Sequence, residues 1–516
     1  MSEQQQQQQP LLKRVAQSVQ KYATFIGPGL VVSVSYMDPG NYSTSVSSGS
    51  MYQYKLCFII FMANLFAIIL QALCVKLGTI TGLDLAEMCR LHLNPRLNLF
   101  MYFCAEIAII ATDLAEVVGT AISLEILFGI PLLYGVLITV LDVLIILMAY
   151  HKDGSMKQTK FFEILVSILV AATCVCFILE LFKCNFEPGS GWEIFKGFLP
   201  VNKEIFKESM ALFLSCGIVG STVMPHSLFL GSALVQPRLK EYDETHGTKL
   251  NVLPDGNEST TRLVPPHQPV EGSRLRRISD GSLLANKYKP SYAAIKYCLN
   301  YSYVELVLSL FIVAVFVNSA ILIVAGSTLY GKPDAADADL LSIYEMLSYY
   351  ISPAAGLVFA LSMLFSGQSA GIVCTMAGQI ISEGFINWTL EPWKRRIVTR
   401  VLAIVPVIVV VGILGREGVS KVMNSSQVVL SFILPIVSAP LIYFTSKKEF
   451  MTVVDTSLTD ESTPLLEEND LDEQIPVRKI SFENGSVLRN ASILTWIIIT
   501  GLNIYLIIAF ANGADI

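Results

Sequence analysis

The sequence predicts an all-α integral membrane protein, and its composition, its apolar segments and its charge distribution all favour this class. Of its 516 residues, 53% are hydrophobic and only 15% are charged, and the mean hydropathy is +0.57. Soluble domains carry about 25% charged residues, so this chain has too few charges to cover so much apolar surface. Lipid must therefore solvate much of the molecule. The polar N-terminus lacks the short apolar core of a secretory signal.

Eleven segments are apolar and long enough to cross a bilayer, which takes about 20 residues. If the N-terminus is cytosolic, 28 of the 36 Lys and Arg residues fall on the cytosolic side. Positive residues concentrate in cytosolic loops, so this asymmetry supports the number of spans and predicts an extracellular or lumenal C-terminus. The predicted spans are 24–47, 56–78, 98–122, 131–150, 161–182, 208–235, 301–326, 352–384, 399–415, 424–446 and 491–511.

Polar segments divide the chain into six parts. Residues 1–22 form a Gln-rich cytosolic tail. Residues 236–298 and 447–490 are rich in polar and charged residues, which predicts two disordered cytosolic loops. The second loop holds an acidic di-leucine pattern that begins at Glu461, so sorting or ubiquitin machinery is a candidate partner. The other parts are 23–235 with spans one to six, 299–446 with spans seven to ten, and 491–516 with the last span and the C-terminus.

The ten cysteines are expected to act as small apolar residues of the core. The sequence has no CxxC motif, which would have indicated a metal or redox site. Seven cysteines lie in apolar segments, namely Cys57, Cys74, Cys104, Cys174, Cys176, Cys216 and Cys374.

The first span is interrupted by Asp38, Pro39, Gly40 and Asn41. Proline removes a backbone donor and clashes with the preceding turn, and glycine adds backbone freedom. The helix is therefore expected to unwind within the membrane. Non-helical backbone survives at that depth only where it lines a protein cavity. An Asp at that depth is costly unless it meets a cation.

The sixth span has a second interruption, at Met224, Pro225 and His226. Interrupted spans at matching positions of two halves indicate a substrate site between inverted repeats. Spans one to five and six to ten are the predicted repeats, and an odd number of spans per repeat turns the second repeat upside down.

The two interruptions together offer a set of metal ligands. They supply the Asp38 carboxylate, the Asn41 amide oxygen, the Met224 thioether, and the freed carbonyls of Ser35 and Ser221. One anion with several neutral oxygens suits a divalent cation that must also be released. A thioether disfavours Mg²⁺ and Ca²⁺ but accepts softer ions such as Mn²⁺, Fe²⁺, Co²⁺ and Cd²⁺. Core packing is the usual role of a buried Met, and the adjacent Pro-His favours a ligand role here.

These motifs resemble those of the Nramp family of proton-coupled divalent metal-ion transporters, and most closely its fungal, Smf-like branch. Asp38 to Asn41 and Met224 to His226 match the hallmarks of this family. Further matches are Ala105 to Glu116 with its third helix, Gly367 to Gln379 with its eighth, and Ser426 to Ser431 with its tenth. The resemblance covers essentially all eleven spans.

The resemblance implies a LeuT-like fold of five plus five inverted helices and symport of a metal ion with H⁺ by alternating access. Mn²⁺ and Fe²⁺ are the implied substrates, with Co²⁺, Cd²⁺ and Zn²⁺ as further candidates, and no prosthetic group is expected. Gln427 is implied to join the ligands in another conformation, and Thr222 to hold a ligand water. The implied proton route consists of His226, Glu116, Asp113, Glu106 and Arg400.

The residues of this route fit proton transfer on their own chemistry. Asp113 and Glu116 share one face of a helix, Glu106 lies two turns along the same face, and His226 is a side chain that titrates near physiological pH. Ser227 and Gly231 stand where the family often has Asn and a second His, so a second His cannot serve here. Five further carboxylates in spans are expected to be structurally paired, namely Asp142, Glu163, Glu180, Glu305 and Glu383.

Other functional classes are less consistent with the sequence. An amino-acid symporter of the same fold would bind a substrate carboxylate, which Asp38 would repel. The long cytosolic loops permit a metal sensor that does not transport, but the complete ligand set argues against it. The sequence shows no enzyme motif and no feature of a nucleic-acid partner, and a monomer is expected. The physiological metal and the membrane (plasma, endosomal or vacuolar) stay open.

Overall fold

The structure, a computed structural model, describes residues 28–139, 156–184, 186–201, 207–246, 288–332, 340–387, 392–455 and 478–513. Residues 132–139 are also helical. The named elements are α3 (Pro28–Val34), α4 (Pro39–Tyr52), α5 (Cys57–Thr81), α6 (Leu85–His92), α7 (Pro95–Phe128), α9 (Met156–Lys183), α10 (Ser190–Gly197), α11 (Ser209–Thr222), α12 (Pro225–Ala233), α13 (Gln236–Thr245), α15 (Tyr292–Ser309), a π-helical turn η2 (Leu310–Ala314), α16 (Val315–Thr328), α17 (Leu340–Tyr350), α18 (Pro353–Ile386), α19 (Pro392–Ser446), β1 (Thr452–Asp455), β2 (Arg478–Ser481) and α20 (Ser486–Ala511).

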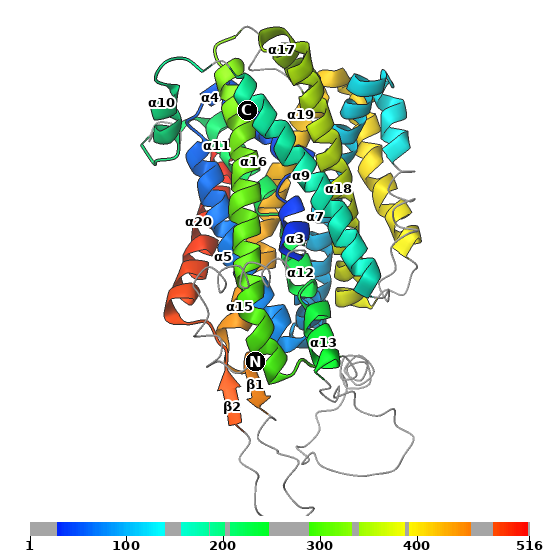
Figure 1. The fold of residues 1–516 in the computed structure, drawn as a ribbon, viewed down its shortest axis with the longest axis vertical. Coiled ribbons are helices and arrows are strands. Elements are labelled where there is room, and N and C mark those ends of the chain that lie inside the picture. The colour runs from blue at the N-terminus through cyan, green and yellow to red at the C-terminus, as the bar shows by residue number, and fades with distance from the viewer. Residues whose placement is uncertain are drawn as a thin grey trace, which may run out of the picture.

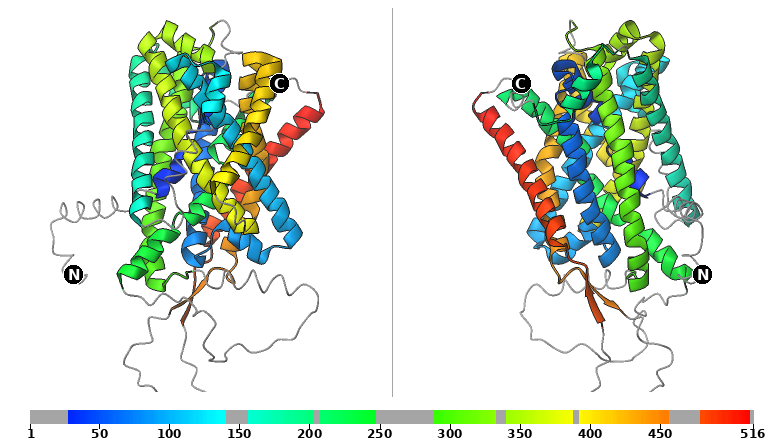
Figure 2. Two further views of the ribbon diagram at one scale, coloured as in Figure 1. Left: turned by 90° about the vertical axis from the view of Figure 1, so that its right-hand side faces the viewer. Right: turned by 60° about the vertical axis from the view of Figure 1, so that its left-hand side comes forward.

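The helices form a bundle whose long axis runs between two different ends. Figure 1 shows α17 at one end and β1 with β2 at the other, which we call the α17 end and the β end. In the centre, α7 packs against α18 and α19, and α4 packs against α16. Figure 2 shows α20, in red, lying along the outside of the bundle.

The surface of the bundle is that of a membrane protein. Eight helical segments among the described residues are long and apolar enough to span a bilayer. Large apolar side chains are exposed along them, such as Phe182 at 85% and Phe103 at 62%. The prediction of an all-α membrane protein is therefore confirmed.

The eight segments do not by themselves give the predicted number of eleven. The first predicted span is divided between α3 and α4, and residues 140–155, which include most of the fourth span, lie outside the described residues. The predicted spans 399–415 and 424–446 belong to one continuous helical segment, α19, so the loop expected between them is wrong. A straight helix of this length would measure about 80 Å, so α19 must bend to stay within a bilayer about 30 Å thick.

The two loops predicted to be disordered contain regular structure at their ends, which corrects that prediction. In 236–298, α13 continues the sixth span as a polar helix, and α15 begins at Tyr292. Asp243 explains this order, because its carboxylate accepts hydrogen bonds from Tyr288 and from the backbone and side chain of Ser291. The middle of this loop, 247–287, lies outside the described residues, as does the tail 1–22.

In the loop 447–490, β1 and β2 form an antiparallel pair in which Thr452 faces Ser481. The pair leads to Asn484, which accepts a hydrogen bond from Lys76 at 3.0 Å and donates one to Thr445 at 2.9 Å. Side-chain hydrogen bonds to α5 and α19 thus order this end of the loop. The di-leucine pattern after Glu461 lies outside the described residues.

Candidate metal site at the paired helix breaks

The first span is broken where the sequence predicts it. α3 ends at Val34 and α4 begins at Pro39, a residue suited to the first helical position because its missing N–H is not needed there. Asp38 caps α4 with its side chain. One carboxylate oxygen, Oδ1, accepts hydrogen bonds from the backbone N–H of Asn41 at 3.0 Å and from Asn41 Nδ2 at 2.7 Å.

Side chains from two other helices hold the unwound segment. Asn318 of α16 donates a hydrogen bond from Nδ2 to the carbonyl of Tyr36 at 2.9 Å, and Ser366 of α18 donates one to the carbonyl of Met37. Both bonds satisfy backbone groups that the break frees. Neither residue was predicted from the sequence to take part in the site. Their only signal was a polar side chain inside an apolar span.

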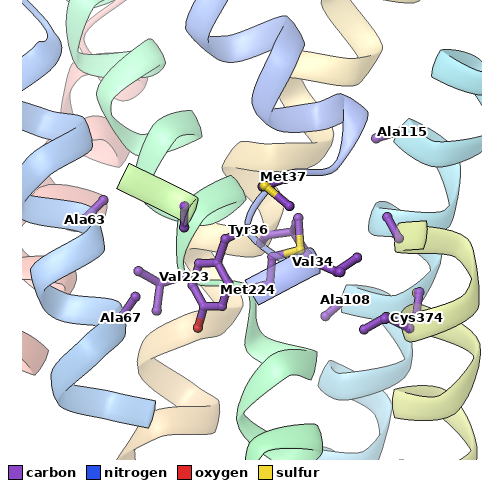
Figure 3. Packing of buried hydrophobic residues seen from close by; sticks show 14 of the residues in the cluster. Val34, Tyr36, Met37, Ala63, Ala67, Ala108, Ala115, Val223, Met224 and Cys374 are labelled. Atoms are coloured by element: carbon purple, nitrogen blue, oxygen red, sulfur yellow. The ribbon is translucent and has the colours of Figure 1, made fainter. Parts of the chain in front are cut away.

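The sixth span is broken in the same way. α11 ends at Thr222, Val223 and Met224 are non-helical, and α12 begins at Pro225. Met224 is 0% exposed and therefore does not face lipid. Figure 3 shows its side chain beside Val34 and Tyr36 of the first break.

Hydrogen bonds join the two breaks directly. Asn41 Nδ2 donates to the Ser221 carbonyl at 2.9 Å, and the hydroxyls of Thr44 and Ser221 lie 3.3 Å apart. Asp38, Asn41 and Ser221 thus form one chain of contacts across the breaks. The predicted metal ligands Asn41 and Ser221 are therefore already in contact, and the groups they offer to an ion are the Asn41 amide oxygen and the second lone pair of the Ser221 carbonyl.

Four buried oxygens around the breaks have no hydrogen-bond partner among the described residues. They are Ser35 Oγ, Asp38 Oδ2, Thr222 Oγ1 and Gln427 Oε1. All four side chains are at most 2% exposed. Buried polar atoms are nearly always paired, so several unpaired oxygens in one region indicate a place where a ligand binds.

Gln427 reaches this region because residue 40 has no side chain. A Cβ at Gly40 would lie only 2.2 Å from Gln427 Nε2. The amide of Gln427 therefore lies against the first break already in this state, where the resemblance placed it only in another conformation. With the Asp38 carboxylate and the Met224 thioether, the set combines one anion, neutral oxygens and one sulfur.

Most residues of the predicted proton route are buried next to the site. His226 is 1% exposed, and its Nδ1 lies 3.4 Å from Thr112 Oγ1. Asp113, Glu116 and Cys374 each place a potential ligand atom within 4.8 Å of the others. Glu106 is only partly buried, two turns earlier in α7. The side chain of Arg400 lies outside the described part of the chain.

The position of the missing second His is filled by a glutamine. A Cβ at Gly231 would lie 2.1 Å from Gln71 Oε1. Gln71 Nε2 lies 3.0 Å from the Tyr36 hydroxyl, the Ser227 hydroxyl and the Ser227 carbonyl. Gln71 and Ser227 thus tie α5 and α12 to the first break, and a His at 231 would displace Gln71.

Structural pairing is confirmed for three of the five other carboxylates in the spans. Glu163 lies 3.5 Å from Arg238, Glu305 accepts a hydrogen bond from the Gly29 N–H at 2.7 Å, and Glu383 accepts one from Gln379 at 2.8 Å. The expectation is wrong for Glu180, whose two carboxylate oxygens have no hydrogen-bond partner among the described residues. Asp142 lies outside the described residues.

Two helix breaks face each other inside a bundle of membrane-spanning helices, and buried oxygens without partners among the described residues surround them. This arrangement defines an integral membrane transporter with a central substrate site. Comparison with known proteins identifies the family. The family model described as "Natural resistance-associated macrophage protein-like" matches residues 29–461, and the chain belongs to this family, Nramp.

Curated relatives match over nearly the whole chain. The iron transporter SMF3 of Saccharomyces cerevisiae is 53% identical and the match covers 98% of this chain and all of that protein. The manganese transporter SMF2 of the same yeast is 48% identical, with 97% of this chain and 90% of that protein covered. These matches confirm the fungal, Smf-like branch and a transporter rather than an enzyme.

A solved structure shares the fold. The manganese transporter of Eremococcus coleocola, in complex with an aromatic bis-isothiourea compound, superposes with a TM-score of 0.69 at 29% identity. The match covers 95% of this chain and 88% of that one. This chain therefore shares the fold of that transporter.

Proposed function

We propose that this chain carries divalent transition-metal ions, such as Mn²⁺ and Fe²⁺, into the cytosol together with protons and by alternating access. The observation that carries this proposal is the set of buried, unpaired oxygens that surrounds the facing breaks, with the Met224 thioether between them. Relatives named as iron and manganese transporters support it.

Each ligand has a separate role in the proposal. Asp38 supplies the negative charge, and its Oδ2 is free to bind the ion because no described residue donates a hydrogen bond to it. Asn41 and the carbonyls of Ser35 and Ser221 supply neutral oxygens. Met224 supplies the sulfur, which favours transition metals over Ca²⁺ and Mg²⁺.

Two further side chains complete the coordination. The Thr222 hydroxyl and the Gln427 amide oxygen are buried and unpaired in the structure, so each can receive a bond from the ion or from its water. We assign Thr222 to a metal-bound water and Gln427 to a direct contact that forms in one conformation of the cycle.

Protons leave the site by a different path from the metal. A bound dication favours the ionised form of Asp38, so a proton held there moves away. His226 is the nearest titratable group of the second break, two residues after Met224, and Asp113 and Glu116 lie in the adjoining helix. The route then continues through Glu106 and Arg400 toward the cytosol.

The β end faces the cytosol in this proposal. In this orientation the predicted cytosolic segments together carry 28 of the 36 Lys and Arg residues, as positive cytosolic loops require. The N-terminus is then cytosolic and the C-terminus is extracellular or lumenal. The plasma membrane and the endosomal or vacuolar membranes are all compatible with this orientation.

Uptake of ⁵⁴Mn²⁺ into proteoliposomes tests the proposal. We expect saturable uptake that external acid stimulates, and a loss of at least about tenfold for Asp38→Ala, because removing the charged ligand of a buried dication costs more than about 1.4 kcal/mol. The matched control is Glu187→Ala, which removes an exposed carboxylate. Unchanged uptake by Asp38→Ala, or entry of labelled amino acids in place of Mn²⁺, would contradict the proposal.

A further inference from the structure

Glu180 is the one buried carboxylate of a span that the proposed transport cycle does not use and that lacks a hydrogen-bond partner among the described residues. It lies in the last turn of α9 and is 1% exposed. A buried acid without a partner is costly to keep, so its presence requires a reason other than structural pairing.

Glu180 lines a cavity whose other walls are apolar. α4 contributes Val46, α9 contributes Phe177, α17 contributes Ile343 and Leu347, and α16 and α18 contribute further apolar side chains. The cavity gives the centre of a water molecule about 10 Å³ of room, which is close to what one water needs.

The cavity lies between the metal site and the α17 end. Tyr42 directly follows the candidate ligand Asn41, and its ring centroid lies 5.3 Å from that of Phe177 and 6.0 Å from that of Phe359. Phe177 and Phe359 also line the cavity, so these rings separate it from the site. In the proposed orientation, this is the outer half of the transporter.

No cation compensates Glu180 in the described structure. No Lys, Arg or His of the described residues lines the cavity. Among the described residues, the titratable groups that interact with Glu180 are Tyr42 of α4, Cys176 of its own helix, and Cys184, which directly follows that helix. The α3 and α16 sequences carry no titratable residue, and Glu345 of α17 is exposed. An ionised carboxylate is very unfavourable in such a cavity, so the closed state holds the neutral acid.

We propose that Glu180 is a proton-binding site of the outer vestibule, and that it must take a proton from the outer solution before the outer side closes over the metal. The carboxylate accepts one H⁺ from outer water and becomes a neutral acid, and it loses that proton when the vestibule opens and hydrates. This inference rests on the proposed transport function and adds a second proton site to the one near His226.

The cavity is poorly suited to a metal ion. Divalent cations such as Ca²⁺ and Mg²⁺ take six or more oxygen ligands, whereas this cavity offers one carboxylate and room for about one water. A proton needs only the carboxylate itself. The inference therefore accounts for the expected stimulation of uptake by external acid without requiring a second metal site.

The first test compares the external pH dependence of Mn²⁺ uptake in wild type and Glu180→Gln, in which the amide imitates the neutral acid. Above the pKa of a single acid, its protonated fraction falls about tenfold for each pH unit. Wild-type uptake should therefore fall several-fold in alkaline medium. Glu180→Gln should match wild type in acid and exceed it several-fold in alkali. Glu187→Gln, an exposed control, should follow wild type. Identical curves for Glu180→Gln and wild type would overturn the inference.

The second test needs no variant. An apolar carbodiimide reacts with protonated carboxylic acids and can reach Glu180 only while the outer vestibule is open. Peptide mass spectrometry should therefore show that Glu180 is modified in mildly acidic outer medium and several-fold less in alkaline medium, while the exposed Glu187 stays largely unmodified in both. Modification of Glu180 that is equal, or absent, in both media would overturn the inference. If wild-type liposomes take up no Mn²⁺, the transport proposal fails, whereas the labelling result still decides whether Glu180 holds a proton.

Discussion

Met224 is the residue on which ion selectivity depends. The other candidate ligands are oxygens, and oxygen ligands suit Ca²⁺ and Mg²⁺ as well as Mn²⁺. The thioether is the only sulfur among the predicted ligands, and it lies beside the first break rather than toward lipid. Selectivity against the abundant alkaline-earth ions therefore rests on this side chain.

Met224→Ala should relax this selectivity more than it lowers Mn²⁺ transport. Without the sulfur, Ca²⁺ should compete with Mn²⁺ several-fold better in uptake assays, because both ions then see an all-oxygen site. Met37→Ala is the matched control, since Met37 is equally buried in the adjacent break but is not a predicted ligand. If Ca²⁺ stays excluded from Met224→Ala, the sulfur is not the selective ligand.

Sequence chemistry predicts some residues of the site and not others. Asp38, Asn41 and Met224 are predictable because each lies within two residues of a helix-breaking proline. Asn318 and Ser366 are not, because a polar side chain in a span gives no sign of which carbonyl it will meet. Glu180 is wrongly predicted to be paired. The rule that acids within spans find partners holds for the three other described examples, and it fails where a cavity takes the place of the partner.

The short helix α3 is the element most suited to move during transport. It has only seven residues, and a segment of turns at residues 35–38 separates it from α4. It packs against α9, α15 and α18, and Glu305 of α15 accepts a hydrogen bond from Gly29 at its start. A Cβ at Gly29 would lie 2.9 Å from that carboxyl group, so the contact is close.

Glu305→Ala should therefore free α3 and open the β end. A hydrogen bond to a charged group contributes about 1.5–3 kcal/mol, so its loss should raise the labelling rate of a cysteine placed at the buried Val32 by about tenfold or more. Glu305→Gln keeps an acceptor and should give an intermediate rate. Glu383→Ala is the control, because that carboxylate pairs with Gln379 of its own helix. Equal labelling rates in all variants would show that Glu305 does not hold α3.

Elements set by local chemistry are predicted better than those set by distant contacts. Pro39 and Pro225 place both helix starts from sequence alone. The continuity of α19 through residues 416–423 escapes prediction because its charged residues are also typical of a loop. The β1–β2 pair escapes it because the order comes from contacts of Asn484 with Lys76 and Thr445, which are remote in the chain.

At the scale of the whole molecule, the site is closed to both sides. Asp38, Met224 and His226 are each at most 1% exposed. The cavity beside Glu180 lies toward the α17 end, and the Glu305 contact holds α3 at the start of the first span. Transport then requires these two regions to open in turn, with the breaks as the fixed point between them.

A closed site that carries net charge across the membrane must respond to the membrane potential. A dication that crosses an inside-negative potential of 100 mV gains about 4.6 kcal/mol, and an accompanying proton adds about 2.3 kcal/mol. A valinomycin-induced, inside-negative potential should therefore stimulate Mn²⁺ uptake even without a pH gradient. Protein-free liposomes and Asp38→Ala are the controls and should show no stimulation. If uptake is the same at zero and at negative potential, the cycle moves no net charge, and compensating proton export would replace symport as the mechanism.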